Sequence, residues 1–173
     1  MTAEVTPHHL LLTEDLASSY DPVYKVNPPL RTKRDVLALR EGLADGTIDI
    51  VATDHAPHPV EHKECEWAAA AFGMIGLETA LSVAYLAMVT SGMMDLGALI
   101  SRMSTQPAKI GRYAGHGSLE IGTEANFALI DTSASWRVDA KGFRSKSKNS
   151  PFIDMDLPIQ VKRTFLRGTE VYS

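Results

Sequence analysis

The order of hydrophobic and polar residues predicts a parallel α/β unit in the first third of the chain. Apolar residues recur at helical spacing over residues 32–44, and Gly46 follows as a stop signal. Residues 48–53 (IDIVAT) are short and rich in β-branched side chains, which predicts a buried strand. Residues 2–13 (TAEVTPHHLLLT) begin with strand-forming residues, but Pro7 disfavours a continuous central strand. A helix, a short apolar strand and then a polar loop are typical of such a unit.

The pattern changes near residue 115. Helical spacing predicts one helix over residues 77–90, a second over residues 96–103, and a short one beginning around Pro107. From Gly117 onward the helical signal fades. Three strand-like runs follow, separated by Gly, Ser and Pro: residues 126–131, 135–138 and 161–167. The tail is therefore expected to belong to a small β domain.

Composition narrows the function classes. The 173 residues include 17 Lys and Arg against 21 Asp and Glu, a formal charge of −4, which argues against a nucleic-acid or anionic-membrane partner. Hydrophobic residues make up 45% and charged residues 22%, as in ordinary globular domains, and no apolar run is long enough to span a membrane. The single cysteine, Cys65, excludes an internal disulfide. No export signal is visible, so a cytoplasmic location is expected.

The densest polar cluster is the run from Asp54 to His58 (DHAPH), directly after the predicted strand. Loops at the C-terminal ends of parallel strands converge on one mouth, where sites are built. An aspartate and two histidines there can ligate a divalent metal or perform acid–base chemistry. The competing interpretation is a hydrogen-bonded strand end with solvated histidines, and these residues alone leave both open.

Other polar residues carry weaker signals. Adjacent His8 and His9 would face opposite sides of a strand, which favours a structural role for them. Asn27, before a Pro-Pro pair, can donate to and accept from an amide-like ligand, or simply form a turn. Arg31 can hold a carboxylate or pair with an acidic neighbour, and Glu4 is expected to be a paired or surface carboxylate.

Residues 62–64, in the stretch before the predicted helix 77–90, form a run of charged side chains that is expected to be solvated. Cys65 has no catalytic signature around it and is given no nucleophilic role. Phe72 and Gly73 precede the helix, where a glycine allows either close backbone approach to a ligand or a tight turn.

Taken together, four segments resemble class I dihydroorotase of the amidohydrolase superfamily. They are TAEVTPHHLLLT (2–13), KVNPPLR (25–31), DGTIDIVATDHAPH (45–58) and FGMIGLETAL (72–81). Residues 125–131 (ANFALID) and 145–152 (SKSKNSPF) look like that superfamily's small β domain. The resemblance covers essentially the whole chain.

The resemblance implies a zinc-dependent hydrolase that opens the ring of dihydroorotate to N-carbamoyl-L-aspartate in pyrimidine synthesis. By that pattern Asp54 is a metal ligand that also carries the proton from the attacking hydroxide to the departing nitrogen. Asn27 and His58 match substrate-binding residues, and Phe72 with Gly73 match a backbone contact to the ring. His55 matches the motif but is not a metal ligand in it, and His8 and His9 match supporting residues.

The resemblance also implies that most metal ligands are missing, since the HxH pair, the bridging carboxylate and the single histidines have no counterpart here. The expected fold is α/β: the last two strands and helices of a (β/α)8 barrel in residues 1–115, plus part of a small β-sandwich domain in residues 116–173. Two zinc ions are expected per complete site, and the chain alone is expected to be inactive. A full-length homo-oligomer and an aspartate transcarbamoylase partner are further expectations. The alternatives are a hydantoinase, an allantoinase or a non-catalytic subunit.

Overall fold

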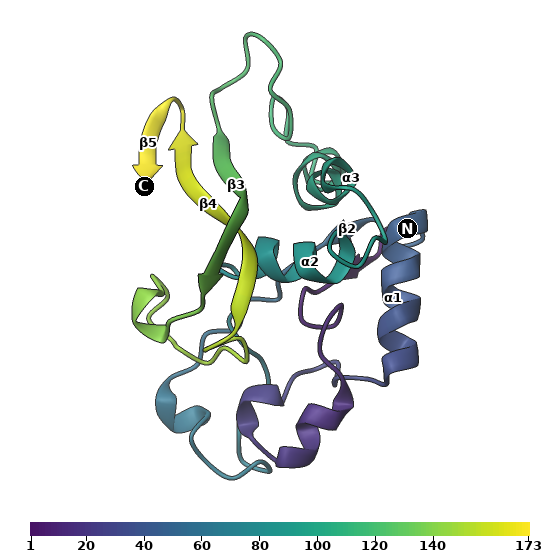
Figure 1. The fold of residues 1–173 in the computed structure, drawn as a ribbon, viewed down its shortest axis with the longest axis vertical. Helices are drawn as coiled ribbons and strands as arrows, with labels where there is room; N and C mark the ends of the chain where they lie inside the picture. The colour runs from purple at the N-terminus through teal and green to yellow at the C-terminus, as the bar shows by residue number, and fades with distance from the viewer.

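The computed structural model describes all 173 residues, which form two separate sheets joined by helices and long loops (Figure 1). The strands are β1 (Glu4–Val5), β2 (Ile50–Val51), β3 (Phe127–Arg137), β4 (Asp156–Leu166) and β5 (Thr169–Tyr172). The α-helices are α1 (Lys33–Asp45), α2 (Ala80–Met88), α3 (Leu96–Ile100) and α4 (Gln106–Ile110). Short helical turns are η1 (Glu14–Ser19), η2 (Pro22–Tyr24), η3 (Val60–His62), η4 (Ser101–Thr105) and η5 (Ala140–Gly142). None of the helices has the length and apolar character that crossing a bilayer requires.

The first sheet is a parallel pair, β1 and β2, connected through α1. Val5 lies opposite Val51, and β1 ends before Pro7, whose ring excludes it from a continuing ladder. Helix α1 confirms the prediction for residues 32–44. It starts at a reciprocal capping box between Thr32 and Asp35 and ends at Gly46, which has a φ of 92°. The predicted strand over 48–53 is parallel as expected but only two residues long.

One apolar cluster, called here the α1 cluster, packs both strands of this pair against the helices. Leu43 of α1 is fully buried and Val36 nearly so, whereas Leu37 on the same helix is 52% exposed. The cluster consists of Val5, Leu10, Leu43, Val51, Ala87 and Met88. It therefore joins α1 and α2 to the two strands.

The helices of the middle region differ from the prediction at their ends. Helix α2 begins at Ala80 rather than Leu77, and Leu77 is 60% exposed. The segment from α3 through η4 to α4 forms one uninterrupted helical run, with a π-type turn in its middle, instead of two separate helices. Pro107 is tolerated because it lies at the second position of α4, where the π-type turn has already shifted the hydrogen bonding.

The second sheet is antiparallel, in the order β3, β4, β5. The two runs predicted at 126–131 and 135–138 are one strand, β3, which crosses an irregular register between Asp131 and Ser135. Strand β4 extends the run predicted at 161–167 toward the N-terminus, and β5 was not predicted. The long β3 and β4 curve past one side of α2, with β5 at the outer edge (Figure 1).

A second apolar cluster, the sheet cluster, joins α2 and the antiparallel sheet to the loops of the N-terminal part. Ser82 of α2 donates to the Ile159 carbonyl at 2.9 Å, and the indole Nε1 of Trp136 donates to the Ser82 hydroxyl at 3.1 Å. The cluster comprises Leu12, Val26, Leu30, Met74, Ile75, Val83, Val138, Phe143, Phe152 and Leu157. It draws on both sides of residue 115, so the two predicted domains share a core and their boundary stays a prediction.

The mixed α/β class agrees with the sequence prediction. The predicted barrel and β-sandwich are not established by these residues alone. Two strands of two residues each cannot close a barrel, and a single three-stranded sheet is not a two-layer sandwich. Both features would need further strands.

Candidate functional site

Asp54 lies three residues beyond β2, where the chain turns sharply. Its φ is 47°, in the left-handed region, and its side chain is exposed. The carboxylate takes part in no hydrogen bond or ion pair of the structure. The next residue, His55, forms a parallel bridge with Met74, and the Ala56 amide donates to the Met74 carbonyl at 3.0 Å. Asp54 and Gly73 therefore each precede one residue of this bridge, on two neighbouring segments of the chain.

The His55 ring is hydrogen-bonded to the backbone just before the next helix. Its Nδ1 accepts from the backbone amides of Gly76 at 3.1 Å and Leu77 at 3.3 Å. Two donors at Nδ1 place the ring hydrogen on Nε2. Because amides at the start of a helical segment have no acceptor within it, the His55 ring satisfies two donors on the approach to α2.

His58 contacts the backbone of Phe72. Its Nε2 lies 2.8 Å from the Phe72 carbonyl, to which it donates, and this leaves Nδ1 with a free lone pair. The His58 amide faces the hydroxyl of Ser147 at 3.2 Å and Oδ1 of Asn149 at 3.4 Å, and the Ser147 hydroxyl donates to the His58 carbonyl at 2.7 Å. The loop is thus held from the far end of the chain.

Gly73 is required by its own conformation and by a close neighbour. Its φ is 117°, and a Cβ there would lie 2.5 Å from the Cβ of Ala56 and 3.4 Å from Nε2 of His58. The close approach that a glycine permits is therefore to the loop 56–58 of the chain itself.

Most backbone groups of Phe72 and Gly73 are already paired. The Gly73 amide donates to the Lys25 carbonyl at 2.9 Å, and the Gly73 carbonyl accepts from Lys63 and Asn149. The Phe72 carbonyl accepts from His58. The Phe72 amide is the one backbone donor of the pair without a partner in the chain, and the Phe72 side chain is 57% exposed.

Asn27 is exposed and precedes a cis peptide bond to Pro28. Buried His9 holds this segment: its Nε2 lies 2.9 Å from the Pro28 carbonyl, and its Nδ1 lies 2.7 Å from the hydroxyl of Thr6. The segment is thereby fixed against the end of β1.

His8 is packed against His9 with ring centroids 4.4 Å apart. The prediction that the two histidines face opposite sides of a strand is wrong, because residues 7–11 form turns and both rings are buried. The Nε2 atom of His8 has no hydrogen-bond partner. Burial, and next the charge of His9, lower the pKa of His8 from 6.5 to about 3.

These side chains do not form a metal centre by themselves. No group of three His, Cys, Asp or Glu side chains is placed to hold an ion, whereas a zinc site needs three or four protein ligands. His9 uses both ring nitrogens and His55 accepts two amides at Nδ1. Asp54 is left as an unpaired carboxylate, so a metal site here would require ligands from outside residues 1–173.

Comparison with known sequences decides the family. A sequence model of the Amidohydrolase family matches residues 14–171. The chain belongs to the amidohydrolase family.

Individual relatives of this amidohydrolase carry one name. A protein of Streptomyces coelicolor called dihydroorotase is 62% identical over 97% of the chain, and one of Leifsonia xyli with the same name is 57% identical over 97%. The chain spans 40% and 39% of the length of these two relatives.

A solved structure has the same fold over nearly the whole chain. The L-hydantoinase (dihydropyrimidinase) of Arthrobacter aurescens superposes on 99% of this amidohydrolase with a TM-score of 0.92 at 37% identity, and the match covers 39% of the hydantoinase. The fold is thus that of a corresponding portion of a longer protein.

The sequence analysis missed the residues that hold this amidohydrolase's loops together. Lys63 is buried at 7% exposure, so its assignment to a solvated charge run was wrong. Asn149 is also buried, and its Nδ2 donates to the carbonyls of Ala56 at 3.0 Å and Gly73 at 3.3 Å. No local pattern marks these residues, because the carbonyls that they contact lie 8 to 93 positions away. Arg31, by contrast, pairs with Asp35 at the surface, at 3.6 Å.

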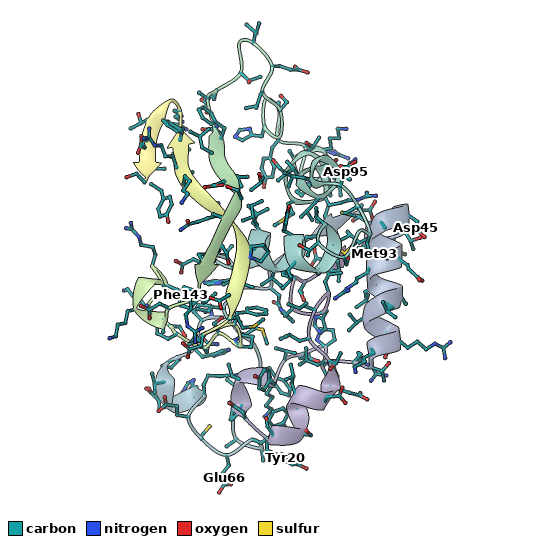
Figure 2. All side chains as sticks on the ribbon, in the orientation of Figure 1. Tyr20, Asp45, Glu66, Met93, Asp95 and Phe143 are labelled. Atoms are coloured by element: carbon teal, nitrogen blue, oxygen red, sulfur yellow. The ribbon has the colours of Figure 1, made fainter.

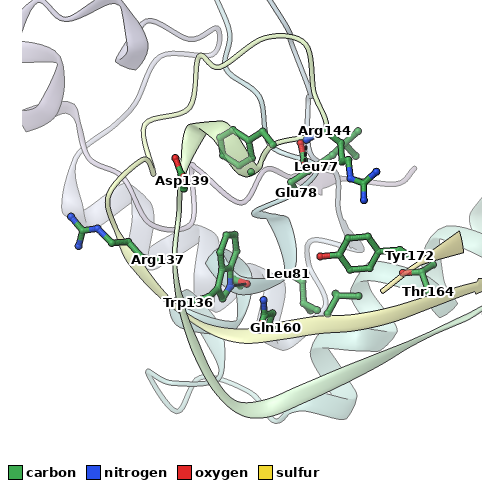
Figure 3. A pocket seen from close by; sticks show the side chains of 14 residues that line it. Leu77, Glu78, Leu81, Trp136, Arg137, Asp139, Arg144, Gln160, Thr164 and Tyr172 are labelled. Atoms are coloured by element: carbon green, nitrogen blue, oxygen red, sulfur yellow. Dashed lines mark hydrogen bonds between the residues drawn. The ribbon is translucent and has the colours of Figure 1, made fainter.

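Two cavities adjoin these loops. One of about 460 Å³ has His58, Lys63 and Ser147 in its wall. The other, of about 490 Å³, lies between the start of α2 and the antiparallel sheet and contains none of the predicted site residues (Figure 3). In that second cavity Glu78 accepts from the Arg144 amide at 2.8 Å. Of the residues expected to contact substrate, only His58 lines either of these two cavities.

Proposed function

We propose that this chain is a portion of a dihydroorotase, which reversibly hydrolyses the cyclic amide of dihydroorotate to N-carbamoyl-L-aspartate in pyrimidine synthesis. The relatives of that name support it, since they match almost from end to end of the chain. The observation that carries the chemistry is the exposed, unpaired Asp54 carboxylate, placed beside Gly73 by the His55–Met74 bridge. Because the chain spans about 40% of its relatives, the activity is assigned to the complete protein.

Asp54 is the proposed proton carrier. A carboxylate without an internal partner is free to accept a proton from the attacking water and to deliver it to the departing ring nitrogen. Zinc, two ions per complete site, is part of the proposal, with Asp54 as one ligand and the other ligands outside this chain. Asp54 alone does not supply a zinc site.

Substrate contacts are proposed for Asn27, for His58 and for the backbone at Phe72 and Gly73. The free amide of Phe72, next to Gly73, donates to a ring carbonyl. The exposed carboxamide of Asn27 both donates and accepts, which matches the N–H and C=O edge of a cyclic amide. His58 contributes the Nδ1 side of a ring whose orientation is fixed by its bond to the Phe72 carbonyl.

Two alternatives keep specific support. The L-hydantoinase likeness favours a different cyclic amide, such as a hydantoin or allantoin, on the same fold. The absence of a metal group among residues 1–173 favours a non-catalytic amidohydrolase-like subunit if this chain acts alone. The main proposal also includes four structural points. They are membership of a (β/α)8 barrel, the domain division at 115/116, homo-oligomerisation and association with an aspartate transcarbamoylase.

The test uses the complete protein that carries this chain. Hydrolysis is measured with dihydroorotate, hydantoin and allantoin in parallel, and dihydroorotate is expected to give the highest kcat/KM. Preferential turnover of hydantoin would replace the proposal by the hydantoinase alternative. Absence of turnover with all three substrates would favour the non-catalytic one.

The role of Asp54 is tested by Asp54→Asn, with Glu61→Gln as the matched control because Glu61 is also an exposed, unpaired carboxylate. We expect Asp54→Asn to lower kcat by about 10² to 10⁴, the usual contribution of a general acid–base group. Measured without metal, its Tm should stay unchanged because the Asp54 side chain makes no hydrogen bond or ion pair within residues 1–173. Near-normal turnover in Asp54→Asn, or an equal loss in Glu61→Gln, would remove the assigned role.

A further inference from the structure

Lys63 is a buried lysine whose ammonium meets carbonyl groups instead of a carboxylate. It follows η3 and is 7% exposed. Its Nζ lies 2.9 Å from the Ala71 carbonyl, 2.9 Å from the Gly73 carbonyl and 3.5 Å from the Lys25 carbonyl. No acidic side chain pairs with it. Burial, together with the charge of Lys25, lowers the pKa of Lys63.

The three carbonyls belong to two segments that carry proposed substrate contacts. Ala71 and Gly73 flank Phe72, whose amide is free. Lys25 precedes Asn27 by two residues, and its carbonyl also accepts from the Gly73 amide at 2.9 Å. The Lys63 ammonium, through its two 2.9 Å bonds on either side of Phe72, and the Gly73–Lys25 backbone bond together hold the Phe72 backbone against the Asn27 segment.

Lys25, the second buried lysine, supports the same loop from the other side. Its Nζ donates to the carbonyls of Trp67 at 2.7 Å, Ala68 at 3.2 Å and Ala70 at 2.7 Å. The same ammonium lies 4.6 Å from the centroid of the Phe72 ring, within cation–π range. Residues 67–73 are thus held by two lysines along their length. A flexible surface loop would not bury two ammonium groups, since each must be matched by hydrogen bonds.

This end of the molecule contains little regular structure. Figure 2 shows Tyr20 and Glu66 at the end formed by η1, η2 and the loop after η3. The Tyr20 ring meets Trp67 edge-on at 6.0 Å. With no helix or sheet ladder through residues 63–73, the lysine bonds supply the order that secondary structure supplies elsewhere.

We propose that Lys63 is a positioning residue of the substrate site, holding the free Phe72 amide at a fixed distance from Asn27 without touching the substrate. The proposal rests on the proposed function of that site. A methionine at position 63 keeps the side-chain length and removes the donors. It leaves the Ala71 carbonyl unpaired, while the Gly73 carbonyl keeps Asn149 and the Lys25 carbonyl keeps the Gly73 amide. The fold is therefore expected to survive with a looser loop.

The experiment compares Lys63→Met with Lys146→Met in the complete protein. Lys146 is exposed and makes no hydrogen bond or ion pair, so it controls for the loss of a lysine charge. A loosened site must be reordered on binding, so KM for dihydroorotate should rise about tenfold in Lys63→Met while kcat stays within about threefold. A purely structural loss would instead lower the active fraction, reducing apparent kcat at constant KM. That second pattern would overturn the proposal.

Two further measurements decide the remaining outcomes. If Lys63→Met does not fold, Lys63→Gln, which retains an N–H donor, should fold with an intermediate KM. Failure of both to fold makes Lys63 a requirement of the fold and overturns the proposal.

If the wild type does not hydrolyse dihydroorotate, the proposed function fails independently. The positioning role is then read from amide hydrogen exchange. Faster exchange at the hydrogen-bonded amides of Ala71 and Gly73 in Lys63→Met, with Leu43 unchanged and Lys146→Met like wild type, supports it. Unchanged exchange at Ala71 and Gly73 overturns it.

Discussion

The α1 cluster and the loop core formed by Lys25, Lys63 and Asn149 are two interiors of the same chain built on different physics. In the α1 cluster, Leu43 and its neighbours exclude water between helices and strands whose backbone bonds are satisfied internally. In the loop core, buried amide and ammonium donors satisfy carbonyls that no ladder satisfies. The α1 cluster stabilises the fold through the apolar area that it buries, and the loop core stabilises it through hydrogen bonds to buried carbonyls.

This difference affects how each interior fails. Apolar packing is lost in proportion to the volume removed, and its effect spreads through the whole cooperative fold. A buried hydrogen-bond network fails at individual groups, because a donor that is removed leaves an unpaired carbonyl behind. The proposed substrate contacts are supported by the second kind of interior, so the site and the fold should respond separately to mutation.

The largest effect on stability is expected from Leu43→Ala. Leu43 is fully buried in the α1 cluster, so its truncation should lower the free energy of unfolding by about 4 kcal/mol. Leu37→Ala on the same helix, where the side chain is half exposed, should cost less than about 1 kcal/mol. Urea titration of both variants measures the difference. Equal costs would mean that α1 does not pack as described.

The next effect is an acid sensitivity that originates at His8. Below pH 6.5 the unfolded chain binds a proton that the folded chain, with a His8 pKa of about 3, does not bind. Stability should therefore be complete above pH 6.5 and should fall as the pH falls toward 3, by about 3 kcal/mol at pH 4.5. His8→Leu cannot take up this proton, so urea midpoints across pH 4.5–7.5 should be flatter in the variant. Parallel curves would show that His8 is not the origin.

A smaller effect is expected in the loop core from Asn149→Asp. The change removes both Nδ2 donors to Ala56 and Gly73 and places an acceptor against their carbonyls, which should cost about 2 kcal/mol. Asn126→Asp is the control for the carboxamide-to-carboxylate change: at this half-buried site the Arg167 amide can still donate to the carboxylate, and only the long bond to Glu124 is lost. Thermal unfolding of both variants measures the cost. If the two variants are equally stable, the loop core does not depend on Asn149.

Local elements were predictable where a periodic apolar pattern coincided with a terminal signal. Helix α1 has both, in the stripe ending at Leu43 and in the turn at Gly46, and it was placed within one residue at each end. Helix α2 has the stripe without a side-chain cap to mark its start, and its first turn was misplaced by three residues. Strand β5 carries no alternation of buried and exposed positions, and all four of its residues are exposed.

The residues of the candidate site also fall into those that the sequence marked and those that it did not. The sequence marked Asp54, Asn27, His58, Phe72 and Gly73 as candidates through strand ends, prolines and a glycine, and their roles, taken from the family resemblance, stay predictions. It was not sufficient to find Lys63, which looks like part of a solvated charge run until Ala71 and Gly73 are folded onto it. Asn149, distant in sequence, was equally invisible.

The sequence by itself determined the hydrophobic periodicity, the stops at Gly46 and Pro7, and the family to which the chain belongs. Tertiary structure alone decided which polar side chains are buried and which carbonyls they meet. The physical reason is that apolar burial and capping depend on neighbours within a few residues, whereas pairing a buried donor depends on where a distant backbone comes to lie.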